Sequence, residues 1–294
     1  MINMIQPVKR IAAIHDISGF GRASLTTIIP ILSTMGFQVC PMPTAILSTH
    51  TGGFQNYSFL DLTNTMVDFM NHWKSLNLHF DCIYSGFLGS AKQIEIVSEF
   101  INIFGDKNNL KVIDPVMGDN GKLYSTMGGS MVENMKKLIK KADIITPNFT
   151  EAAYLLDKNV DDNITECTIK DWLKELAEKG PKIVIITSVP DINHNQCTNV
   201  MAYNKEDDIF WKVGCKYIPA FYPGTGDIFA SVLIGSLLQG DSLPIALDRS
   251  THFITTCIKA SYGFKYPNRE GVLLERVLNT LNMPVTMSSY EILE

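Results

Sequence analysis

The chain lacks closely spaced cysteines and long apolar runs. Its cysteines are scattered, with no CxxC pair and no histidine at zinc-ligand spacing; they are Cys40, Cys82, Cys167, Cys197, Cys215 and Cys257. Scattered cysteines of this kind are typical of free thiols in a reducing compartment. No run approaches the ~18 apolar residues of a membrane span, and residues Met1 to Arg10 lack the apolar core of a secretion signal. We therefore expect a cytoplasmic protein with no membrane partner.

The chain also lacks a basic stretch. Charged residues make up 19% of it, the net charge is −5, and basic runs are no longer than pairs such as Lys140–Lys141. A protein that follows a nucleic-acid backbone needs a stripe of positive charge, so nucleic acid is not an expected partner. There is no internal repeat and no low-complexity linker. With 46% hydrophobic residues, 294 residues can form one α/β unit, and we expect a single domain over residues 1–294.

Short apolar, β-branched runs alternate with longer patterns of helical period. The runs expected as strands are Arg10–Ile14, Phe37–Val39, Cys82–Tyr84, Lys111–Ile113, Ile144–Thr146 and Ile183–Thr187. The patterns expected as helices are Leu25–Met35, Leu62–Leu76, Lys92–Phe104, Ser130–Lys140, Glu151–Leu156, Ile169–Glu178, Asp227–Leu238 and Leu243–Ser261. This alternation predicts an α/β fold with a mainly parallel central sheet and helices on both faces.

One pair of runs departs from the alternation. Thr198–Tyr203 and Ile209–Val213 are joined by a turn rich in Asn, Lys and Asp, which predicts an antiparallel hairpin at one edge of the sheet. In open α/β sheets the ligand crevice lies beyond the carboxyl ends of the strands. Residues that bind or react with a ligand should therefore follow the predicted strands.

The most informative motif is Gly224-Thr225-Gly226-Asp227, which precedes an apolar helical pattern. Two glycines allow backbone amides to converge at a helix start, where the unpaired N–H groups and the helix dipole attract an anion. A carboxylate beside that anion site could take a proton from an alcohol while the amides hold a transferring phosphoryl group. The alternative is an aspartate that only caps the helix.

Further carboxylates follow two other predicted strands. Asp114 and Asp119 frame the stretch Asp-Pro-Val-Met-Gly-Asp, and Mg²⁺ in phosphoryl transfer is usually held by one or two carboxylates and water. The same dipeptides are also ordinary turn formers. Asn148 and Glu151 have the spacing of a capping box, whereas the functional interpretation makes Glu151 a water-mediated contact to Mg²⁺. Both interpretations can hold together.

Two glycine-containing clusters complete the set of candidate motifs. The segment Ser18-Gly19-Phe20-Gly21-Arg22-Ala23-Ser24 resembles a dinucleotide fingerprint only superficially, because residues 37–49 contain no acidic residue to bind a ribose. The polar run Ser48-Thr49-His50-Thr51-Gly52-Gly53 is suited to hydrogen-bonding a small ring, although a lone histidine is more often structural. Phe87, between Gly86 and Gly89, could pack on an aromatic ligand or belong to the core.

In this order, the motifs resemble those of the pyridoxal/pyridoxine/pyridoxamine kinase family of the ribokinase-like superfamily. The resemblance covers roughly Lys9 to Ser261 and rests on Ser-Thr-His-Thr-Gly, Ser-Gly-Phe-Leu-Gly-Ser, Asp-Pro-Val-Met-Gly-Asp, Thr-Pro-Asn-x-x-Glu and Gly-Thr-Gly-Asp. It implies a ribokinase-like three-layer sandwich that transfers a phosphoryl group from ATP, with Mg²⁺, to the hydroxymethyl group of a B6 vitamer. It also implies a homodimer and a monovalent cation such as K⁺.

The resemblance assigns roles to individual residues. It makes Asp227 the base and the amides of Gly224, Thr225 and Gly226 the anion hole. On the nucleotide side it implies Asp114, Asn148, Glu151, Thr187, Gly224 and Gly226, with Asp114 and Glu151 serving the metal. On the vitamer side it implies Asp16, Ser18, Thr49, His50, Thr51 and Phe87 beside Asp227.

Two positions depart from the family pattern, and two other functions stay open. Asp16 stands where relatives have serine, and Phe87 stands where they have tyrosine, so the preferred vitamer is open.

The first alternative function is that of a hydroxymethylpyrimidine kinase of the same fold, whose members usually carry cysteine where Asp227 stands. The second is a non-catalytic sensor of B6 or nucleotide, which would be expected to lose the base.

Overall fold

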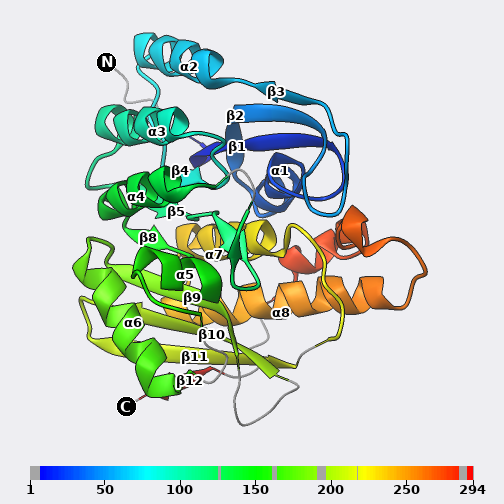
Figure 1. The fold of residues 1–294 in the computed structure, drawn as a ribbon. Coiled ribbons are helices and arrows are strands. Elements are labelled where there is room, and N and C mark those ends of the chain that lie inside the picture. Colours follow the sequence, from blue (N-terminus) through cyan, green and yellow to red (C-terminus); the bar gives the residue numbers. More distant parts are fainter. Residues whose placement is uncertain are drawn as a thin grey trace.

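The computed structural model describes residues 7–124, 127–160, 164–190, 197–216, 218–284 and 290–293. Its central feature is a ten-stranded sheet in the order β12-β11-β10-β9-β8-β5-β4-β1-β2-β3 (Figure 1). The strands are β1 Arg10–Phe20, β2 Gln38–Thr49, β3 Phe59–Asp61, β4 Cys82–Ser85, β5 Leu110–Ile113, β8 Ile144–Ile145, β9 Ile183–Pro190, β10 Cys197–Asn204, β11 Ile209–Lys216 and β12 Glu291–Leu293. A separate ribbon consists of β6 Gly118–Asp119 and β7 Lys122–Leu123.

Helices cover both faces of this sheet. The α-helices are α1 Leu25–Thr34, α2 Thr63–Ser75, α3 Ala91–Phe104, α4 Gly129–Leu138, α5 Phe149–Leu155, α6 Glu166–Glu178, α7 Thr225–Gln239 and α8 Leu243–Tyr262. Short 3₁₀ helices lie at η1 Ile139–Lys141, η2 Asn268–Glu270, η3 Leu274–Arg276 and η4 Leu278–Asn282. Within the described ranges, no helix is both long enough and apolar enough to cross a membrane.

The strand directions confirm the predicted architecture. The six strands from β2 through β1, β4, β5 and β8 to β9 run parallel, and β10 and β11 form an antiparallel hairpin beside β9. The sequence analysis missed β3, which closes one edge, and β12, which pairs with β11 and closes the other. Each has only three residues, too few to show a period.

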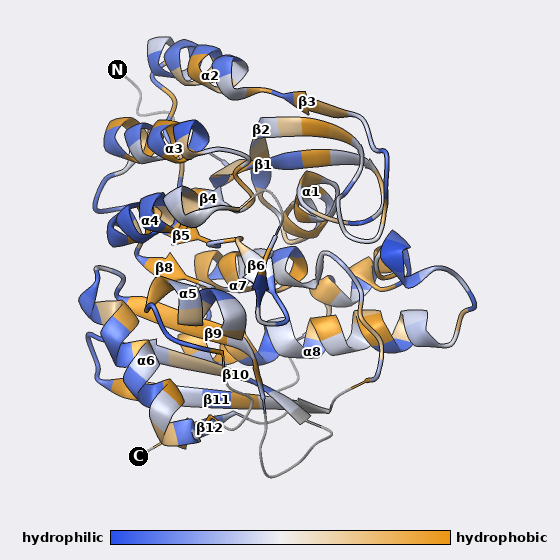
Figure 2. Ribbon diagram, in the orientation of Figure 1, coloured by the Kyte–Doolittle hydropathy of each residue, from blue (hydrophilic) through white to orange (hydrophobic). Residues whose placement is uncertain are grey.

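The sheet separates two hydrophobic cores. On β1, Ala12 and Ile14 face the core formed with α2 to α6, while Ile11 and Ala13 face the core formed with α1, α7 and α8. This is the two-residue alternation of a strand that is buried on both faces. Figure 2 shows hydrophobic residues gathered on the central strands and on α7, with hydrophilic residues on the outer side of α4.

Helix α7 lies deepest among the helices described. Every residue from Ile228 to Ser236 is buried, so the helix has no solvent-facing stripe. It packs against α1 and α8, and it shares its hydrophobic core with residues of the central strands. Because a helix surrounded in this way cannot shift without disturbing the core, its first turn is held rigidly at the carboxyl edge of the parallel strands.

The first two strands are longer than predicted. The sequence analysis ended the first strand at Ile14 and the second at Val39, but β1 reaches Phe20 and β2 reaches Thr49. In β1 the cause is a set of polar residues that are buried inside the strand, including His15, Asp16 and Ser18, and in β2 it is the pair Pro41 and Pro43. Polar residues after an apolar run usually mark a turn, so the pattern pointed to the wrong boundary.

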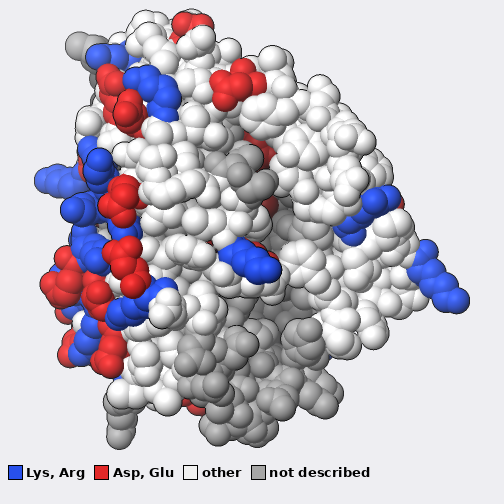
Figure 3. Space-filling model, viewed as in Figure 1, with Lys and Arg blue, Asp and Glu red and all other residues white. Residues whose placement is uncertain are grey.

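Charged residues of both signs mix on the side of the molecule where α3, α4 and α6 lie (Figure 3). Lys136 contacts Asp157 at 2.6 Å, Lys158 pairs with Glu175, and Lys212 contacts Glu166 at 2.9 Å. Exposed pairs of this kind contribute little to stability individually. They leave no continuous stretch of positive charge on this side of the view.

Candidate active site

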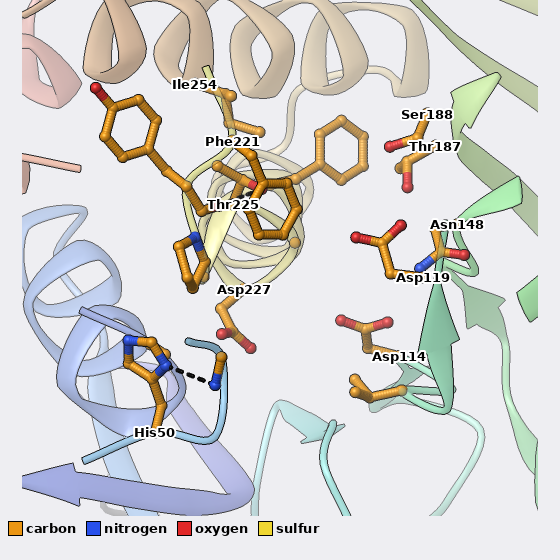
Figure 4. A pocket seen from close by; sticks show the side chains of 18 of the residues that line it. His50, Asp114, Asp119, Asn148, Thr187, Ser188, Phe221, Thr225, Asp227 and Ile254 are labelled. Carbon is orange, nitrogen blue, oxygen red and sulfur yellow. Dashed lines mark hydrogen bonds between the residues drawn. The ribbon is translucent and has the colours of Figure 1, made fainter. Parts of the chain in front are cut away.

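The carboxyl ends of the parallel strands and the start of α7 surround a cavity of about 810 Å³. Most residues predicted from the motifs line it: Asp16, His50, Thr51, Phe87, Asp114, Asn148, Glu151, Thr187, Gly224, Thr225, Gly226 and Asp227. Figure 4 shows Asp227 and Asp114 pointing into the cavity from different elements, with Asn148 and Thr187 beyond them. The tertiary structure therefore brings together motifs that are far apart in the sequence.

The glycine turn before α7 is required by a close approach of two backbone segments. Gly224 has a φ of 81°, and a Cβ atom there would lie 2.2 Å from the carbonyl oxygen of Arg22. Any other residue would be strained and would collide with that carbonyl. The turn therefore lets the first amides of α7 reach the cavity, where an anion is favoured by the unpaired N–H groups and the helix dipole.

Asp227 does not cap its own helix. Its Oδ2 atom accepts a hydrogen bond from the backbone N–H of Ser24 at 2.8 Å, and Gly224 caps α7 without any side-chain bond. The alternative that Asp227 is only a capping residue is therefore wrong. Burial, together with the nearby Asp16 carboxylate, raises the pKa of Asp227 to about 7. A carboxylate with such a pKa can exchange a proton near neutral pH.

Ser24 joins Asp227 to Asp16 and was missed by the motif analysis. Its hydroxyl donates to Asp16 Oδ1 at 2.5 Å, while its N–H holds Asp227. Its φ of 52° is unusual for a serine, and this backbone conformation accompanies the two contacts. Burial also raises the pKa of Asp16. Ser24 ended the predicted glycine turn, but nothing in the sequence indicated that it faces two carboxylates.

Ser18 and Thr49 do not line the cavity, in contrast to the other residues predicted for the vitamer side. Ser18 is fully buried within β1, and its hydroxyl donates to Asp16 Oδ2 at 3.3 Å. Thr49 ends β2 opposite Phe20, and no hydrogen-bond partner for its hydroxyl occurs in the described part of the chain. Ser18 lies two positions after Asp16 on the same strand, and its hydrogen bond supports the Asp16 carboxylate.

His50 is held by two hydrogen bonds that define its protonation. Nε2 lies 2.7 Å from the carbonyl oxygen of Arg269, and Nδ1 accepts the N–H of Gly52 at 3.1 Å (Figure 4). A carbonyl oxygen can only accept, so Nε2 carries the proton and the ring is neutral. Burial lowers the pKa of His50, against the effect of the Arg269 carbonyl. His50 therefore orients the turn that carries Thr51 and Gly52.

Aromatic side chains line the cavity around this turn. Phe54 meets the His50 ring at a centroid distance of 5.0 Å, and the guanidinium of Arg269 lies 4.8 Å above the Phe54 ring. Phe87 is half-buried, packs against the core and also lines the cavity, and its contact with an aromatic ligand stays a prediction. Phe221 lines the opposite wall and is 62% exposed. These faces suit a flat aromatic ligand.

Glu151 forms the capping box predicted from its spacing. Its side chain accepts the N–H of Asn148 at 2.8 Å, and its own N–H donates to Asn148 Oδ1 at 2.9 Å. Its other oxygen accepts the N–H of Met117 at 2.9 Å. Burial raises the pKa of Glu151 to about 8. Because both oxygens already accept backbone hydrogen bonds, only their remaining lone pairs face a ligand or water.

Asp114 and Asp119 bring further negative charge to the same wall. Burial and the neighbouring Glu151 and Asp227 carboxylates raise the pKa of Asp114 well above its usual value. Asp119, the second carboxylate of this motif, points into the cavity in Figure 4. Burial raises the pKa of Asp119 as well.

The oxygen-bearing side chains that line the cavity suit a hard cation that also binds oxygen atoms of a ligand. Among the described residues, no three or more His, Cys, Asp or Glu side chains are arranged to enclose a metal ion. The cavity is nevertheless lined by carboxylates at Asp16, Asp114, Asp119, Glu151 and Asp227, and its described lining includes no Lys or Arg. Mg²⁺ typically takes one or two carboxylates, water and substrate phosphates, so these residues fit it.

Thr187 reaches the cavity from β9. Its N–H donates to the carbonyl oxygen of Pro147 at 3.0 Å, which ties β9 to the segment before Asn148. The next residue, Ser188, has a φ of 57° and also lines the cavity. Thr187 and Asn148 therefore share one wall with the acidic residues.

Comparisons with known proteins agree with this geometry. The family model described as phosphomethylpyrimidine kinase matches residues 23–271. A Bacteroides thetaiotaomicron protein provisionally assigned as a phosphomethylpyrimidine kinase is 55% identical to this chain in a rhombohedral crystal form, which covers 99% of this chain and 100% of that chain with a TM-score of 0.96. Its orthorhombic form with pyridoxal is 56% identical, covers 97% and 100%, and has a TM-score of 0.94.

Two pyridoxal kinases are also similar. The structure of the enzyme from Lactobacillus plantarum is 28% identical, covers 93% of this chain and 96% of that chain, and has a TM-score of 0.85. The pyridoxal kinase of Arabidopsis thaliana is 27% identical over 257 residues, which are 84% of this chain and 78% of that relative. The resemblance inferred from the motifs is thus confirmed: the chain belongs to the phosphomethylpyrimidine kinase family and is similar to pyridoxal kinases of the ribokinase-like superfamily.

Proposed function

We propose that this protein is an ATP-dependent kinase that phosphorylates the 5′-hydroxymethyl group of pyridoxal, pyridoxine or pyridoxamine and so feeds pyridoxal 5′-phosphate salvage. The observation that carries the proposal is the position of Asp227, a largely buried carboxylate with 14% of its side chain exposed, which lies beside the first amides of α7 and does not serve as a cap. The pyridoxal bound to the Bacteroides relative supports a B6 vitamer as the acceptor. In this proposal residues 1–294 form one kinase domain.

The chemistry follows from the two groups at the start of α7. Asp227 takes the proton of the hydroxymethyl group, so that the alcohol oxygen can attack the γ-phosphorus as its O–H bond breaks. The amides of Gly224, Thr225 and Gly226 hydrogen-bond the phosphoryl oxygens while the bond to ADP breaks. Asn148, Thr187 and Phe221 line the side that holds the nucleotide.

The charge of the cavity requires cations. ATP brings several negative charges to a wall already lined by carboxylates, without a Lys or Arg in the described lining. Asp114 directly and Glu151 through water would hold Mg²⁺, which when bound neutralises phosphate charge and orients the transferring group. A monovalent cation such as K⁺ is proposed for the same reason. A cytoplasmic location fits an enzyme that uses ATP.

One alternative function is supported by a specific finding. The matching family model is described as phosphomethylpyrimidine kinase, so hydroxymethylpyrimidine is a second candidate acceptor. Asp227 weighs against it, because such enzymes usually carry cysteine at this position. It also weighs against a non-catalytic B6 or nucleotide sensor, because a sensor would not need to keep the base.

The first prediction tests the function and its base together. Purified protein should phosphorylate B6 vitamers faster than hydroxymethylpyrimidine, and Asp227→Asn should lower kcat by about 10²–10⁴-fold, the usual contribution of a general base. KM should change little, because Asn keeps the shape. Since only the ionised carboxylate accepts a proton, the wild-type kcat/KM, which reports the pKa values of the free enzyme, should rise with pH through about 7, and this rise should vanish in the variant. A normal kcat in Asp227→Asn contradicts the assignment.

The second prediction concerns the choice among vitamers. Asp16 places a carboxylate where relatives have a hydroxyl, and it should favour the cationic aminomethyl group of pyridoxamine over the aldehyde of pyridoxal. Asp16→Ser should therefore bring the kcat/KM values for the two vitamers closer. Asp16→Asn keeps the shape and removes only the charge, so it should act in the same direction. An unchanged ratio in both variants would mean that Asp16 does not read the substrate.

The third prediction separates the two roles of Glu151. Glu151→Gln removes a charge and leaves one backbone N–H facing an amide NH₂, so it should lower the melting temperature and also raise the Mg²⁺ concentration needed for half-maximal rate. Thr165→Ala is the matched control, because Thr165 caps α6 through the N–H of Thr168 and loses a cap worth about 0.5–2 kcal/mol. The control should leave the Mg²⁺ titration unchanged. A wild-type titration for Glu151→Gln would exclude the metal role.

The fourth prediction concerns a proposed homodimer. The outermost strand β3 exposes Leu60 and its cross-strand neighbour Ile46, with 57% and 45% of each side chain accessible. An exposed sheet edge with apolar residues is a natural surface for a second copy. Leu60→Lys should convert the dimer to a monomer in sedimentation velocity, whereas Met283→Lys, at an equally exposed site, should not. A monomeric wild-type protein would refute the proposal.

A further inference from the structure

His15 is a buried side chain that the proposed chemistry does not yet use. It lies in β1 immediately before Asp16 and is completely inaccessible to solvent. Neither of its ring nitrogens has a hydrogen-bond partner within the described ranges. Leaving a buried polar atom unpaired is costly, so such a residue in a folded protein calls for a reason.

The position of the His15 ring beside Asp227 gives such a reason. Nδ1 lies 3.9 Å from Asp227 Oδ1, which is longer than a hydrogen bond of about 2.7–3.2 Å. A shift of about 1 Å would close this distance to a direct bond. The other oxygen of the same carboxylate already accepts the N–H of Ser24 at 2.8 Å.

The surroundings hold the ring in this orientation. Tyr84 on β4 meets it edge-on, with a centroid distance of 4.3 Å and an interplanar angle of 64°. Gly86 leaves room for it, because a Cβ atom at that position would lie 2.3 Å from Cε1 of His15. The ring therefore occupies a slot between two neighbouring strands, with its Nδ1 edge toward Asp227.

The ring is neutral in this slot. Burial lowers the pKa of His15 to about 3, so it has one N–H donor and one acceptor nitrogen. The ionisable groups around it are Asp227 on α7 and Tyr84 on β4, with Asp16 and Asp114 acting on those two groups. An ionised Asp227 only accepts hydrogen bonds, so the tautomer with the proton on Nδ1 complements it.

We propose that His15 is a positioning residue for Asp227, whose Oδ1 accepts the Nδ1–H of His15 once nucleotide and acceptor alcohol are bound. With Ser24 on one oxygen and His15 on the other, the plane of the carboxylate is fixed and its remaining lone pairs face the alcohol. The alcohol proton passes to Asp227, and His15 keeps its own proton throughout. The inference rests on the proposed role of Asp227 as the base.

Two substitutions and a double-mutant cycle test the inference. His15→Leu removes both nitrogens, whereas His15→Asn keeps an amide N–H near the position of Nδ1. We expect His15→Leu to lower kcat roughly 10- to 100-fold, the range for a lost hydrogen bond to a charged group, with KM little changed. His15→Asn should restore most of that loss. In the Asp227→Asn background, His15→Leu should cause no further decrease, because the partner charge is already gone.

A merely structural role predicts a different pattern. The same decrease in both backgrounds, or an unchanged kcat in His15→Leu, would overturn the inference. Phe100→Leu is the control: Phe100 is fully buried in an aromatic cluster with Phe80 and Phe104, outside the residues that line the cavity. It should lower the melting temperature without lowering kcat, which separates lost stability from lost positioning.

One measurement on the wild-type protein tests the inference without any substitution and without catalytic turnover. The ¹⁵N chemical shifts of the wild-type His15 ring, measured with Mg-ADP added, report which nitrogen carries the proton. A protonated Nδ1 supports the inference and a protonated Nε2 contradicts it, even if His15→Leu fails to fold. If the wild-type protein phosphorylates no B6 vitamer, the proposed function fails, whereas the ring shifts still decide the role of His15.

Discussion

The site depends on the contact between the start of α7 and the turn that follows β1. Gly224 lies against the carbonyl oxygen of Arg22 so closely that a Cβ atom could not fit, and the N–H of Ser24 binds Asp227 across the same contact. Helix α7 is buried from Ile228 to Ser236, which anchors the junction at its start. The amides that attract an anion and the carboxylate that can take a proton are therefore held by one rigid element.

The same junction links the two halves of the cavity. Ser24 donates its hydroxyl to Asp16 on the vitamer side and its N–H to Asp227 on the reacting side. A change in the charge or position of Asp16 can therefore alter the position of Asp227 through Ser24 alone. The direct repulsion between the two carboxylates adds to this effect. Asp16, which we propose reads the vitamer, and Asp227, the proposed base, are thus structurally coupled through Ser24.

Accumulated negative charge is the main electrostatic cost of the arrangement. Burial raises the pKa of Asp114, Glu151 and Asp227 together, and mutual repulsion raises that of Asp114 further. Without a compensating cation, the folded protein favours the protonated forms of these groups. A bound cation with its phosphate ligand would favour the ionised carboxylates instead. Binding of the nucleotide with its cation is therefore linked to the release of protons from these carboxyl groups.

The sequence by itself determined the alternation of strands and helices, the edge hairpin and twelve of the residues that line the cavity. Those features are local: apolar period, glycine turns and capping spacing can be recognised within a dozen residues. The Asn148–Glu151 capping box is an example, because its two partners are three residues apart.

Only the tertiary structure decided which polar residues face the cavity and which support it. Ser18 and His15 lie inside a strand that the pattern had ended too early, since buried polar residues in a strand look like a turn. Ser24 and Asp227 are bonded across 203 positions. No local pattern encodes such a contact, because it forms only when the sheet and α7 are packed together.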